Sequence, residues 1–343
     1  MTGLVSNLKI VSATEENAHD WATIYLEGLK SCKWMSRYLS KQQLTLKKVE
    51  QIFLRQIQEQ EPKDQFLIGY IDNTPVGIIQ FTTYWIPTAS KILTHFPLVH
   101  PRFQRRGVGK SLVRVGVKNA LAKGDINVWS EGWSKDKREL AVYEAFYQAI
   151  GFEKKSNRLE LCCLLREFDE NILPEKKELQ VVHSNKMSDE LVEVISKAYS
   201  NSQDQLHILT NFRDKALTRK FLEKSIEDFG KAGFEINSSI FKFQGEICAG
   251  LLTGTSKEKG IILEVGVIQK FRRKRIGLQI VSSSLLSMQA QGIKEVVLGV
   301  DANNKAAINL YEKLGFQKSW YGQLLQLENK QKLGIDNTLV DEK

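Results

Sequence analysis

The chain has 343 residues, of which 42% are hydrophobic and 26% are charged. These proportions are typical of globular proteins and exclude a disordered or fibrous chain. At roughly 100–200 residues per domain, the length predicts two domains. The net charge is +9, and its location matters because a diffusely basic surface and local basic clusters imply different partners.

Several classes of protein are disfavoured by what the sequence lacks. No apolar run approaches the roughly 18 residues of a membrane-spanning helix, and the N-terminus has no signal-peptide core. We therefore expect a cytoplasmic protein with no membrane partner. The four cysteines form no CxxC pair and no histidine lies at metal-ligand spacing, so we expect no metal site and no disulfide framework.

Taken in chain order, the first half predicts strands, one basic loop and two helices. The expected elements are a strand over 8–11, a hairpin of strands over 66–71 and 76–83 that turns at Asp72-Asn73, a strand over 93–99, a helix after the basic loop with a cap at Gly124, a strand over 126–130 and a helix that ends at Gly151. This order is typical of a mixed α/β sheet and not of a purely parallel one.

The second half predicts the same order. Its expected elements are a hairpin of strands over 240–243 and 247–253 that turns at Gln244-Gly245-Glu246, a strand over 261–267, a helix with a cap at Gly292, a strand over 295–301 and a helix that ends at Gly315. Each half therefore carries a strand, a basic loop and a helix in direct succession.

Two pairs of segments also match in sequence. Leu98–Gly109 (LVHPRFQRRGVG) resembles Gly266–Gly277 (GVIQKFRRKRIG), and Tyr147–Phe152 (YQAIGF) resembles Tyr311–Phe316 (YEKLGF). Because both pairs are separated by nearly the same number of residues, we expect tandem copies of one unit. The expected domains are residues 8–166 and 179–330, with a charged linker over 167–178 and a flexible tail over 331–343.

The basic loops have the residue types of a phosphate site. A strand that leads through a glycine turn into a helix presents several backbone N–H groups and the positive end of the helix dipole. Gly107 and Gly109 leave the backbone accessible, while Arg105, Arg106 and Lys110 add positive charge. Taken alone, these residues are equally typical of a solvated basic turn.

The same residues resemble the acetyl-CoA signature of the GNAT superfamily of acyl-CoA-dependent N-acyltransferases, V-x-P-x-x-(Q/R)-x-x-G-x-(G/A). Its defined positions are matched by Val99, Pro101, Gln104, Gly107 and Gly109. The family's second signature, N-x-x-A-x-x-L-Y-x-x-x-G-F, is matched by Asn303, Ala306, Leu310, Tyr311, Gly315 and Phe316. The resemblance implies two tandem GNAT-like domains, each α/β with a mixed, predominantly antiparallel central sheet flanked by helices.

The resemblance also implies acetyl-CoA as the cofactor and transfer of its acetyl group to a primary amine of a small molecule or peptide by direct attack on the thioester. The coenzyme pyrophosphate would lie on the backbone of residues 104–110. The coenzyme-binding residues expected in the first copy are Leu98, Val99, Gln104, Arg105, Arg106, Gly107, Val108, Gly109 and Lys110. Those expected in the second copy are Val267, Arg272, Arg273, Lys274, Ile276, Gly277 and Asn303.

The reaction needs a general base for the amine and a proton donor for the departing sulfur. The resemblance assigns the donor role to Tyr147 and Tyr311, and it places Glu264 where the family often has its base. The first copy has no carboxylate in the matching strand, which leaves His95, His100 or Glu131 as its possible bases. For either histidine, a structural hydrogen bond is the competing interpretation.

The second copy departs from the signature in its loop, with Gln269 at the Pro position and Arg275 at the first Gly position. Two divisions of labour therefore remain open. The first domain acetylates beside a degenerate second domain, or the second domain catalyses while the first binds acetyl-CoA without turnover, as in a tandem member of the family. The chain itself is expected to be a monomer that acts as an intramolecular pseudo-dimer, or a homodimer.

Two other functions share this fold: a catalytically silent acetyl-CoA sensor or scaffold, and a tandem aminoacyl transferase that uses aminoacyl-tRNA. The charge distribution bears on the second. The basic residues of the two loops together equal the whole net charge of +9, and they are Arg102, Arg105, Arg106, Lys110, Lys270, Arg272, Arg273, Lys274 and Arg275. Positive charge confined to these loops favours a phosphate-bearing coenzyme over a nucleic acid.

Overall fold

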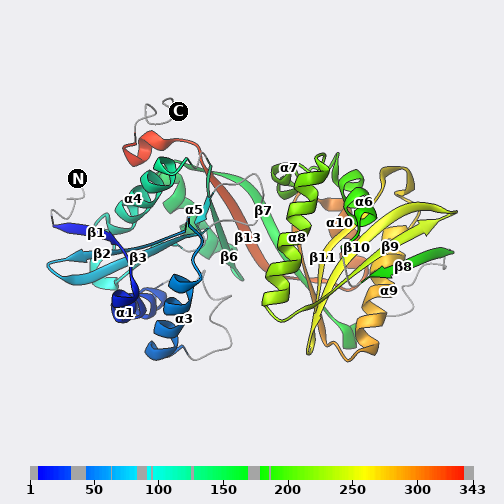
Figure 1. Ribbon diagram of the computed structural model, residues 1–343, viewed down its shortest axis with the longest axis horizontal. Helices are drawn as coiled ribbons and strands as arrows, with labels where there is room; N and C mark the ends of the chain where they lie inside the picture. The colour runs from blue at the N-terminus through cyan, green and yellow to red at the C-terminus, as the bar shows by residue number, and fades with distance from the viewer. Residues whose placement is uncertain are drawn as a thin grey trace. The chain divides into compact units, whose positions relative to one another are not determined.

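The computed structural model describes residues 7–31, 44–62, 64–82, 91–93, 96–124, 127–168, 178–184 and 187–335. These residues form two compact units (Figure 1). The first consists of the described residues before Asn157 together with those from Tyr321 onward, and the second consists of Asn157–Trp320. In the part of the chain that is described, no helix is long and apolar enough to cross a membrane.

The sheet of the first unit has the strand order β1-β2-β3-β4-β6-β13, and the short β5 also pairs with β3. Neighbours are antiparallel except β4 and β6, which are parallel. The strands are β1 (Leu8–Ser12), β2 (Gln65–Ile71), β3 (Thr74–Thr82), β4 (Lys91–Leu93), β5 (Leu98–Val99), β6 (Val128–Ser134) and β13 (Gln317–Leu327). The α-helices are α1 (Ala18–Leu29), α3 (Leu46–Gln58), α4 (Val108–Ala122) and α5 (Lys137–Ala149).

The second unit repeats this arrangement with the order β8-β9-β10-β11-β12-β7. Here β11 and β12 are the parallel neighbours. The strands are β7 (Phe152–Leu164), β8 (Leu179–Ser184), β9 (Glu235–Phe243), β10 (Glu246–Ser256), β11 (Lys259–Val267) and β12 (Glu295–Asp301). The α-helices are α6 (Asp189–Tyr199), α7 (Gln205–Thr210), α8 (Lys215–Lys231), α9 (Ile276–Ala290) and α10 (Lys305–Lys313).

The last strand of each sheet comes from the other half of the sequence. β7 follows helix α5 of the first unit, yet from Arg158 onward it pairs with β12 in the second. β13 follows α10 of the second unit, yet from Tyr321 onward it pairs with β6 in the first. The compact units therefore differ from the expected limits at 166 and 330. Each exchanged strand covers the backbone edge of β6 or β12, which would otherwise be left unpaired.

The expectation of a flexible tail over 331–343 is wrong for its first residues, which pack in the first unit. Leu333 and Ile335 are each 1% exposed and belong to the apolar core between α4 and the sheet of the first unit. Arg114 of α4 donates a hydrogen bond to the Gly334 carbonyl. These contacts follow from the exchange, because β13 delivers the residues after it to the first unit. Residues 336–343 and most of the expected linker, 169–177, lie outside the described residues.

The expected repeated elements are present. Both hairpins turn through left-handed residues, Asp72 (φ 48°) and Asn73 (φ 61°) in one and Gln244 (φ 53°) and Gly245 (φ 80°) in the other, which is the turn type that matches strand twist. The strand expected over 93–99 is divided into β4 and β5. Helices α1, α3, α6, α7 and α8 were not anticipated from the sequence.

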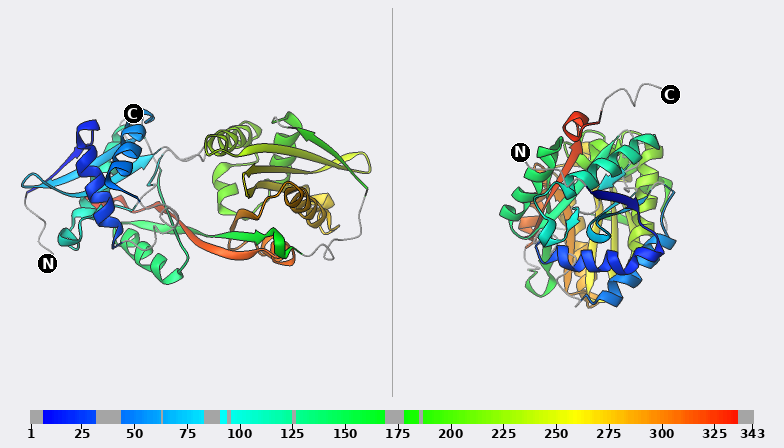
Figure 2. Two further views of the ribbon diagram at one scale, coloured as in Figure 1. Left: turned by 90° about the horizontal axis from the view of Figure 1, so that it is seen from below. Right: turned by 90° about the vertical axis from the view of Figure 1, so that its left-hand side faces the viewer.

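The layers of the second unit place its helices on both faces of one sheet. Figure 2 shows the strands between α8 on one side and α9 on the other. The close approach of α6 is possible because Gly250 of β10 has no side chain; a Cβ there would lie 2.5 Å from Val194. Leu252 faces the same helices in the core. Since Glu264 of β11 is its cross-strand partner, the Glu264 side chain projects toward the same face as Leu252.

Candidate functional site

In the second unit, two parallel strands part beside the basic loop. The pairing of β11 with β12 ends at Ile262 and Leu298, although β11 continues to Val267. A bulge between Leu252 and Thr253 of β10 shifts the register, which leaves Leu263 as an extra residue of β11 beside Glu264. Bulges of this kind end pairing and redirect side chains next to functional sites. In the first unit the described pairing of β4 with β6 joins Lys91–Leu93 to Val128–Ser130.

The loop of the first unit ends in an unusual backbone conformation. Gly107 has φ 86° at the N-terminus of α4, and Arg105 has φ 61°. The first backbone hydrogen bond of α4 runs from Ser111 N–H to the Gly107 carbonyl. The N–H groups of residues 108–110 therefore precede the helical hydrogen-bond ladder and are available to an anion.

The loop of the second unit has the same shape. Arg273 (φ 59°) and Arg275 (φ 61°) are left-handed at the positions of Arg105 and Gly107, and the Gln279 N–H donates to the Arg275 carbonyl. Arg275 thus adopts the conformation that the signature assigns to glycine, and its side chain is exposed. The departure at this position changes the side chain and leaves the course of the backbone unaltered.

Two of the expected coenzyme-binding side chains hold the loops together. Gln104 Nε2 donates to the Val99 carbonyl at 3.0 Å, and Arg272 Nε donates to the Val267 carbonyl at 3.0 Å. The side chains of Leu98, Val99, Val108 and Ile276 are buried in the core, so any coenzyme contact of these four residues would use the backbone.

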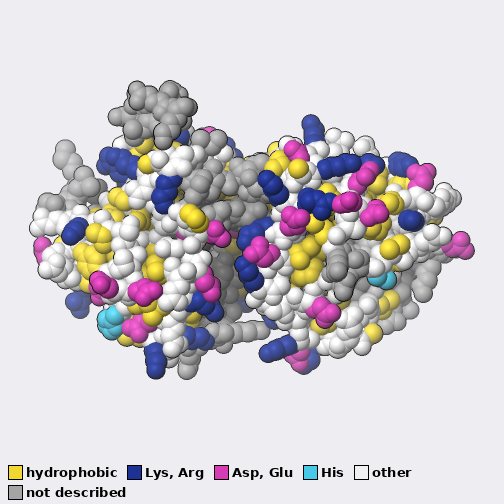
Figure 3. All heavy atoms as spheres, viewed as in Figure 1, with side chains coloured by type: hydrophobic (Ala, Val, Ile, Leu, Met, Phe, Trp, Pro, Cys, Tyr) yellow, Lys and Arg dark blue, Asp and Glu magenta, His cyan; other side chains and the backbone are white. Residues whose placement is uncertain are grey.

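The charges of the loops differ from those on the rest of the surface. Acidic and basic side chains alternate over α6 and α8 (Figure 3), where ion pairs include Lys197–Glu193, Lys215–Glu193, Arg219–Asp189, Lys224–Asp228 and Lys231–Glu227. In contrast, among the described residues no ion pair involves Arg105, Arg106, Lys110, Arg273 or Arg275. Lys270 and Lys274 are less available, because Lys270 pairs with Glu246 and Lys274 lies over the rings of Phe243 and Phe271.

An aromatic cluster surrounds Tyr147 in the first unit. Its side chain is fully buried, and its hydroxyl has no hydrogen-bond partner among the described residues. Phe96 lies against it with ring centroids 5.9 Å apart. Because a buried hydroxyl without a partner is costly, the Tyr147 hydroxyl suits a ligand atom that completes its hydrogen bonding. Burial also raises the pKa of Tyr147.

The described candidates for a general base in the first unit, Glu131 and His100, are not placed to act together with Tyr147. The hydroxyl of Ser130 hydrogen-bonds Tyr143, and a Cβ at Gly132 would touch the Tyr143 ring, so Glu131 projects from the opposite face of β6. The Nδ1 atom of His100 accepts the Arg102 N–H at 3.2 Å, which is a structural hydrogen bond. His95 lies outside the described residues.

The second unit brings a carboxyl group and two tyrosines together. Glu264 is partly buried and interacts electrostatically with Tyr311, which is 7% exposed. Tyr199, at the end of α6, donates its hydroxyl hydrogen to the Val265 carbonyl at 3.0 Å and accepts the Val265 N–H at 3.2 Å, and Val265 is the residue next to Glu264 along the chain. Sequence reasoning missed Tyr199, because its helix matches neither signature.

The protonation of these groups follows from their burial. Desolvation raises the pKa of Glu264 to about 8, although Tyr199 acts in the opposite direction. Desolvation likewise raises the pKa of Tyr311, and the Glu264 carboxylate adds to that shift. Near neutral pH the carboxyl can therefore exchange a proton while the Tyr311 hydroxyl keeps its own, which gives an acid and a base in one site.

Asn303, the remaining expected coenzyme residue, lies between β12 and α10. Its backbone N–H donates to Asp301 Oδ1 at 2.8 Å, and the residue is exposed. In the described residues, no group of three or more histidine, cysteine, aspartate or glutamate residues has the arrangement of a metal site.

Comparison with known proteins identifies both units. Residues 205–316 match the model of the acetyltransferase (GNAT) family, and residues 62–154 match that of the acetyltransferase (GNAT) domain. A mycothiol acetyltransferase of Streptomyces scabiei is 25% identical over 260 residues, which cover 73% of this chain and 73% of that protein.

Two solved structures share the fold over nearly the whole chain. One is a tandem GNAT protein from the clavulanic acid biosynthesis pathway, with a TM-score of 0.59, 12% identity and coverage of 93% of this chain and 98% of that chain. The other is a GCN5-related N-acetyltransferase from Sphaerobacter thermophilus, with a TM-score of 0.60, 16% identity and coverage of 94% and 96%. At these identities the likeness establishes the fold alone.

Proposed function

Because this chain belongs to the GNAT acetyltransferases and carries two GNAT domains in tandem, we propose that it transfers the acetyl group of acetyl-CoA to a primary amine of a small molecule or peptide, and that the second unit performs the transfer. The observation that carries this proposal is the position of Glu264 at the bulge where β11 parts from β12, with Tyr199 bound to the next residue, Val265; from there Glu264 acts electrostatically on Tyr311. The relatives named mycothiol acetyltransferases support acetyl transfer as the reaction class.

Acetyl-CoA would supply an acyl group activated as a thioester. Residues 104–110 and 272–277 are suited to its phosphates, since both loops have the same backbone conformation and arginines that form no ion pair among the described residues. The two units differ in the role we assign to them. The first binds the coenzyme without turnover, because Phe96 stands where the second unit has Glu264 and Glu131 projects from the other face.

In the second unit, the residues divide the proton transfers between them. The Glu264 carboxylate takes a proton from the attacking ammonium group, which leaves a neutral amine nucleophile. The Tyr311 hydroxyl, kept protonated by burial, donates its proton to the departing sulfur. Tyr199 orients Glu264 by holding the backbone of the next residue, Val265, through two hydrogen bonds.

The test combines thiol release with coenzyme binding. Purified protein is incubated with acetyl-CoA and a panel of primary amines while free thiol is followed, and coenzyme A binding is measured by calorimetry. Arg275→Glu places a negative charge at the second loop, and Arg275→Gly is its matched control without that charge. We expect Arg275→Glu to lower thiol release much more than Arg275→Gly does.

Gly107→Glu tests whether a negative charge at the first loop affects coenzyme binding and thiol release. Gly107→Arg is its control for backbone strain. We expect Gly107→Glu to remove a coenzyme-binding site with a smaller effect on turnover than Arg275→Glu has. Turnover that depends on Gly107 and is indifferent to Arg275→Glu would place the reaction in the first unit. Coenzyme binding without thiol release for any amine would instead favour a sensor.

A further inference from the structure

Two buried carboxylates tie together the two loops that flank the Glu264 site. Asp204 is 5% exposed and Asp301 is 1% exposed. Asp204 accepts the backbone N–H groups of Leu206 at 2.9 Å and of Asp301 at 3.3 Å. Asp301 accepts the N–H groups of Gln205 at 3.4 Å and of Asn303 at 2.8 Å. Each acid therefore holds the backbone of the other's loop.

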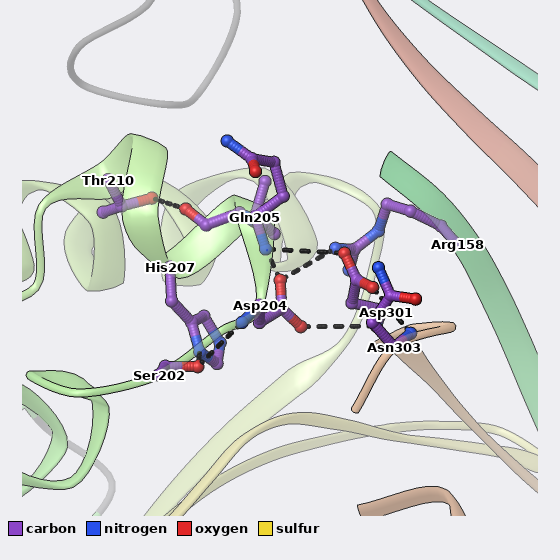
Figure 4. A network of polar contacts seen from close by, with 9 residues as sticks. Arg158, Ser202, Asp204, Gln205, His207, Thr210, Asp301 and Asn303 are labelled. Atoms are coloured by element: carbon purple, nitrogen blue, oxygen red, sulfur yellow. Dashed lines mark hydrogen bonds and ion pairs between the residues drawn. The ribbon is translucent and has the colours of Figure 1, made fainter. Parts of the chain in front are cut away.

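Arg158 supplies positive charge to this pair. Its Nη1 atom lies 3.3 Å from Asp204 Oδ1, and Figure 4 shows its side chain reaching from β7 toward the two acids. The residue is 9% exposed. A buried ion pair stabilises a protein only when further hydrogen bonds satisfy the charges, and the four backbone N–H groups provide them here. By sequence Arg158 follows the first copy's helix α5, although it packs in the second unit.

The tied loops carry the two tyrosines of the reaction site. Tyr199 immediately precedes the loop of Asp204, and its ring stacks on that of His207 with centroids 3.8 Å apart. His207 Nδ1 is in turn 2.8 Å from Ser202 Oγ. On the other side, Asp301 ends β12 and is followed by α10, which carries Tyr311. The position of each tyrosine beside Glu264 therefore depends on the same pair of acids.

We propose that Arg158, Asp204 and Asp301 form a clasp, a set of positioning residues that holds Tyr199 and Tyr311 on Glu264, and that the second unit is competent only when the first copy's exchanged strand supplies Arg158. This inference rests on the proposed function of Glu264. It assigns a reaction-linked role to the strand exchange, since the second copy's own sequence does not contain the cation of the clasp.

The clasp also acts on Glu264 through charge. The titratable groups that act electrostatically on Glu264 are Tyr199 from α6, Tyr311 from α10, Asp204 before α7 and Arg158 from β7; His207 and Asp301 interact with Asp204. Asp204 raises the pKa of Glu264, whereas Arg158 lowers it. Removing each charge should therefore move the ionisation of Glu264 in opposite directions, which a general loosening of the fold would not do.

The experiment compares Arg158→Met with Asp204→Asn in the full chain. Asparagine caps a helix as well as aspartate does, so Asp204→Asn removes the charge and keeps the cap. We expect the midpoint of the pH–rate profile of Arg158→Met to move up by about one pH unit. At a pH well below the pKa of Glu264, this shift corresponds to a rate about tenfold lower than that of the wild type. The profile of Asp204→Asn should move down. Arg158→Lys, which keeps the charge, should restore the wild-type midpoint with a lowered kcat.

The matched control is Lys155→Met, on the same strand. Lys155 pairs with Glu328 at 2.8 Å in the first unit, so this variant should leave the midpoint unchanged. Midpoints that stay fixed in both clasp variants, or that move in the same direction, would overturn the inference. If Arg158→Met does not fold, Asp204→Asn and Arg158→Lys decide by the same criteria.

A second readout does not depend on turnover. The difference in unfolding free energy between the wild type and Glu264→Gln depends on pH through the ionisation of Glu264. The midpoint of this pH dependence should move to higher pH when the difference is measured in the Arg158→Met background. It should move to lower pH in the Asp204→Asn background. Opposite shifts in a protein that releases no thiol would leave the clasp standing and reject the proposed function. Thiol release without opposite shifts of this pH dependence in the two variants would instead support the proposed function and reject the clasp.

Discussion

Phe96 and Glu264 occupy corresponding positions in the two units, each three residues before the valine that opens the basic loop, Val99 or Val267. Phe96 packs its ring against Phe146 with centroids 4.6 Å apart and against Tyr147. Glu264 instead provides a carboxyl that acts electrostatically on Tyr311. One exchange of residue type thus separates a unit that can accept a proton at this position from one that cannot.

The reaction rate should report the ionisation of Glu264. Because burial raises the pKa of this carboxyl to about 8, kcat/KM should rise with pH and level off above about 8. The measurement is initial thiol release between pH 6 and 10 at saturating acetyl-CoA, with correction for the amine substrate's own titration by using amines of different pKa. A profile already level at pH 6 would show that a different group is the base.

Stability should depend on the same carboxyl. In the unfolded chain Glu264 ionises near its ordinary value of 4.5, whereas in the folded protein it keeps its proton until about pH 8. Between these values the folded state binds more protons, so stability falls as pH rises. Glu264→Gln lacks this loss, and its unfolding free energy relative to the wild type should increase from pH 5 to pH 8. Denaturant unfolding of both proteins at each pH checks this, and a constant difference would contradict it.

His207 should make the protein sensitive to acid. Burial lowers its pKa to about 4, although Asp204 acts to raise it. Its stabilising contribution is therefore present above the ordinary value of 6.5 and is lost as pH falls toward 4. His207→Phe retains an aromatic ring against Tyr199 but has no proton to gain. Its stability relative to the wild type should rise as pH falls through this window, and thermal unfolding at pH 7, 5.5 and 4.5 measures the trend.

Arg275 should carry a small conformational cost. A non-glycine residue in the left-handed region is disfavoured by about 1 kcal/mol, and Arg275 has φ 61° where the first unit has Gly107. Arg275→Gly should therefore stabilise the protein by up to about 1 kcal/mol, while Gly107→Arg should destabilise it by a similar amount. Urea unfolding of the two reciprocal variants provides the comparison. A loss of stability in Arg275→Gly would mean that its exposed side chain makes a favourable interaction that outweighs the strain.

The sequence predicted the repeated part of the fold well, because that part is local. Hairpin turns, basic loops and helix caps are determined by neighbouring residues, such as Asp72 and Asn73 or Gly124 and Gly292, whose positive φ values follow from their residue types. Glu264 and Tyr311 could be proposed from the sequence, because Tyr311 matches the second signature and Glu264 lies on the strand where the family often has its base; their roles stay predictions.

The partners of Glu264 were not predictable in the same way. Tyr199 and His207 lie in helices that carry no signature, and their stacking is a tertiary contact. Arg158 reaches Asp204 because β7 pairs with β12 and not with a strand of its own copy. Either pairing would satisfy the alternating pattern of β7, so the choice between them depends on the packing of the whole sheet.

The most direct test of the account is a comparison of one carboxylate from each unit. Glu264→Gln should reduce kcat for thiol release by about 100-fold or more, the usual contribution of a general base, with coenzyme A affinity preserved. Glu131→Gln, the same substitution in the first unit, should leave kcat within about twofold, because its side chain projects away from Tyr147. The opposite result, with turnover lost in Glu131→Gln and retained in Glu264→Gln, would contradict the assignment of the reaction to the second unit.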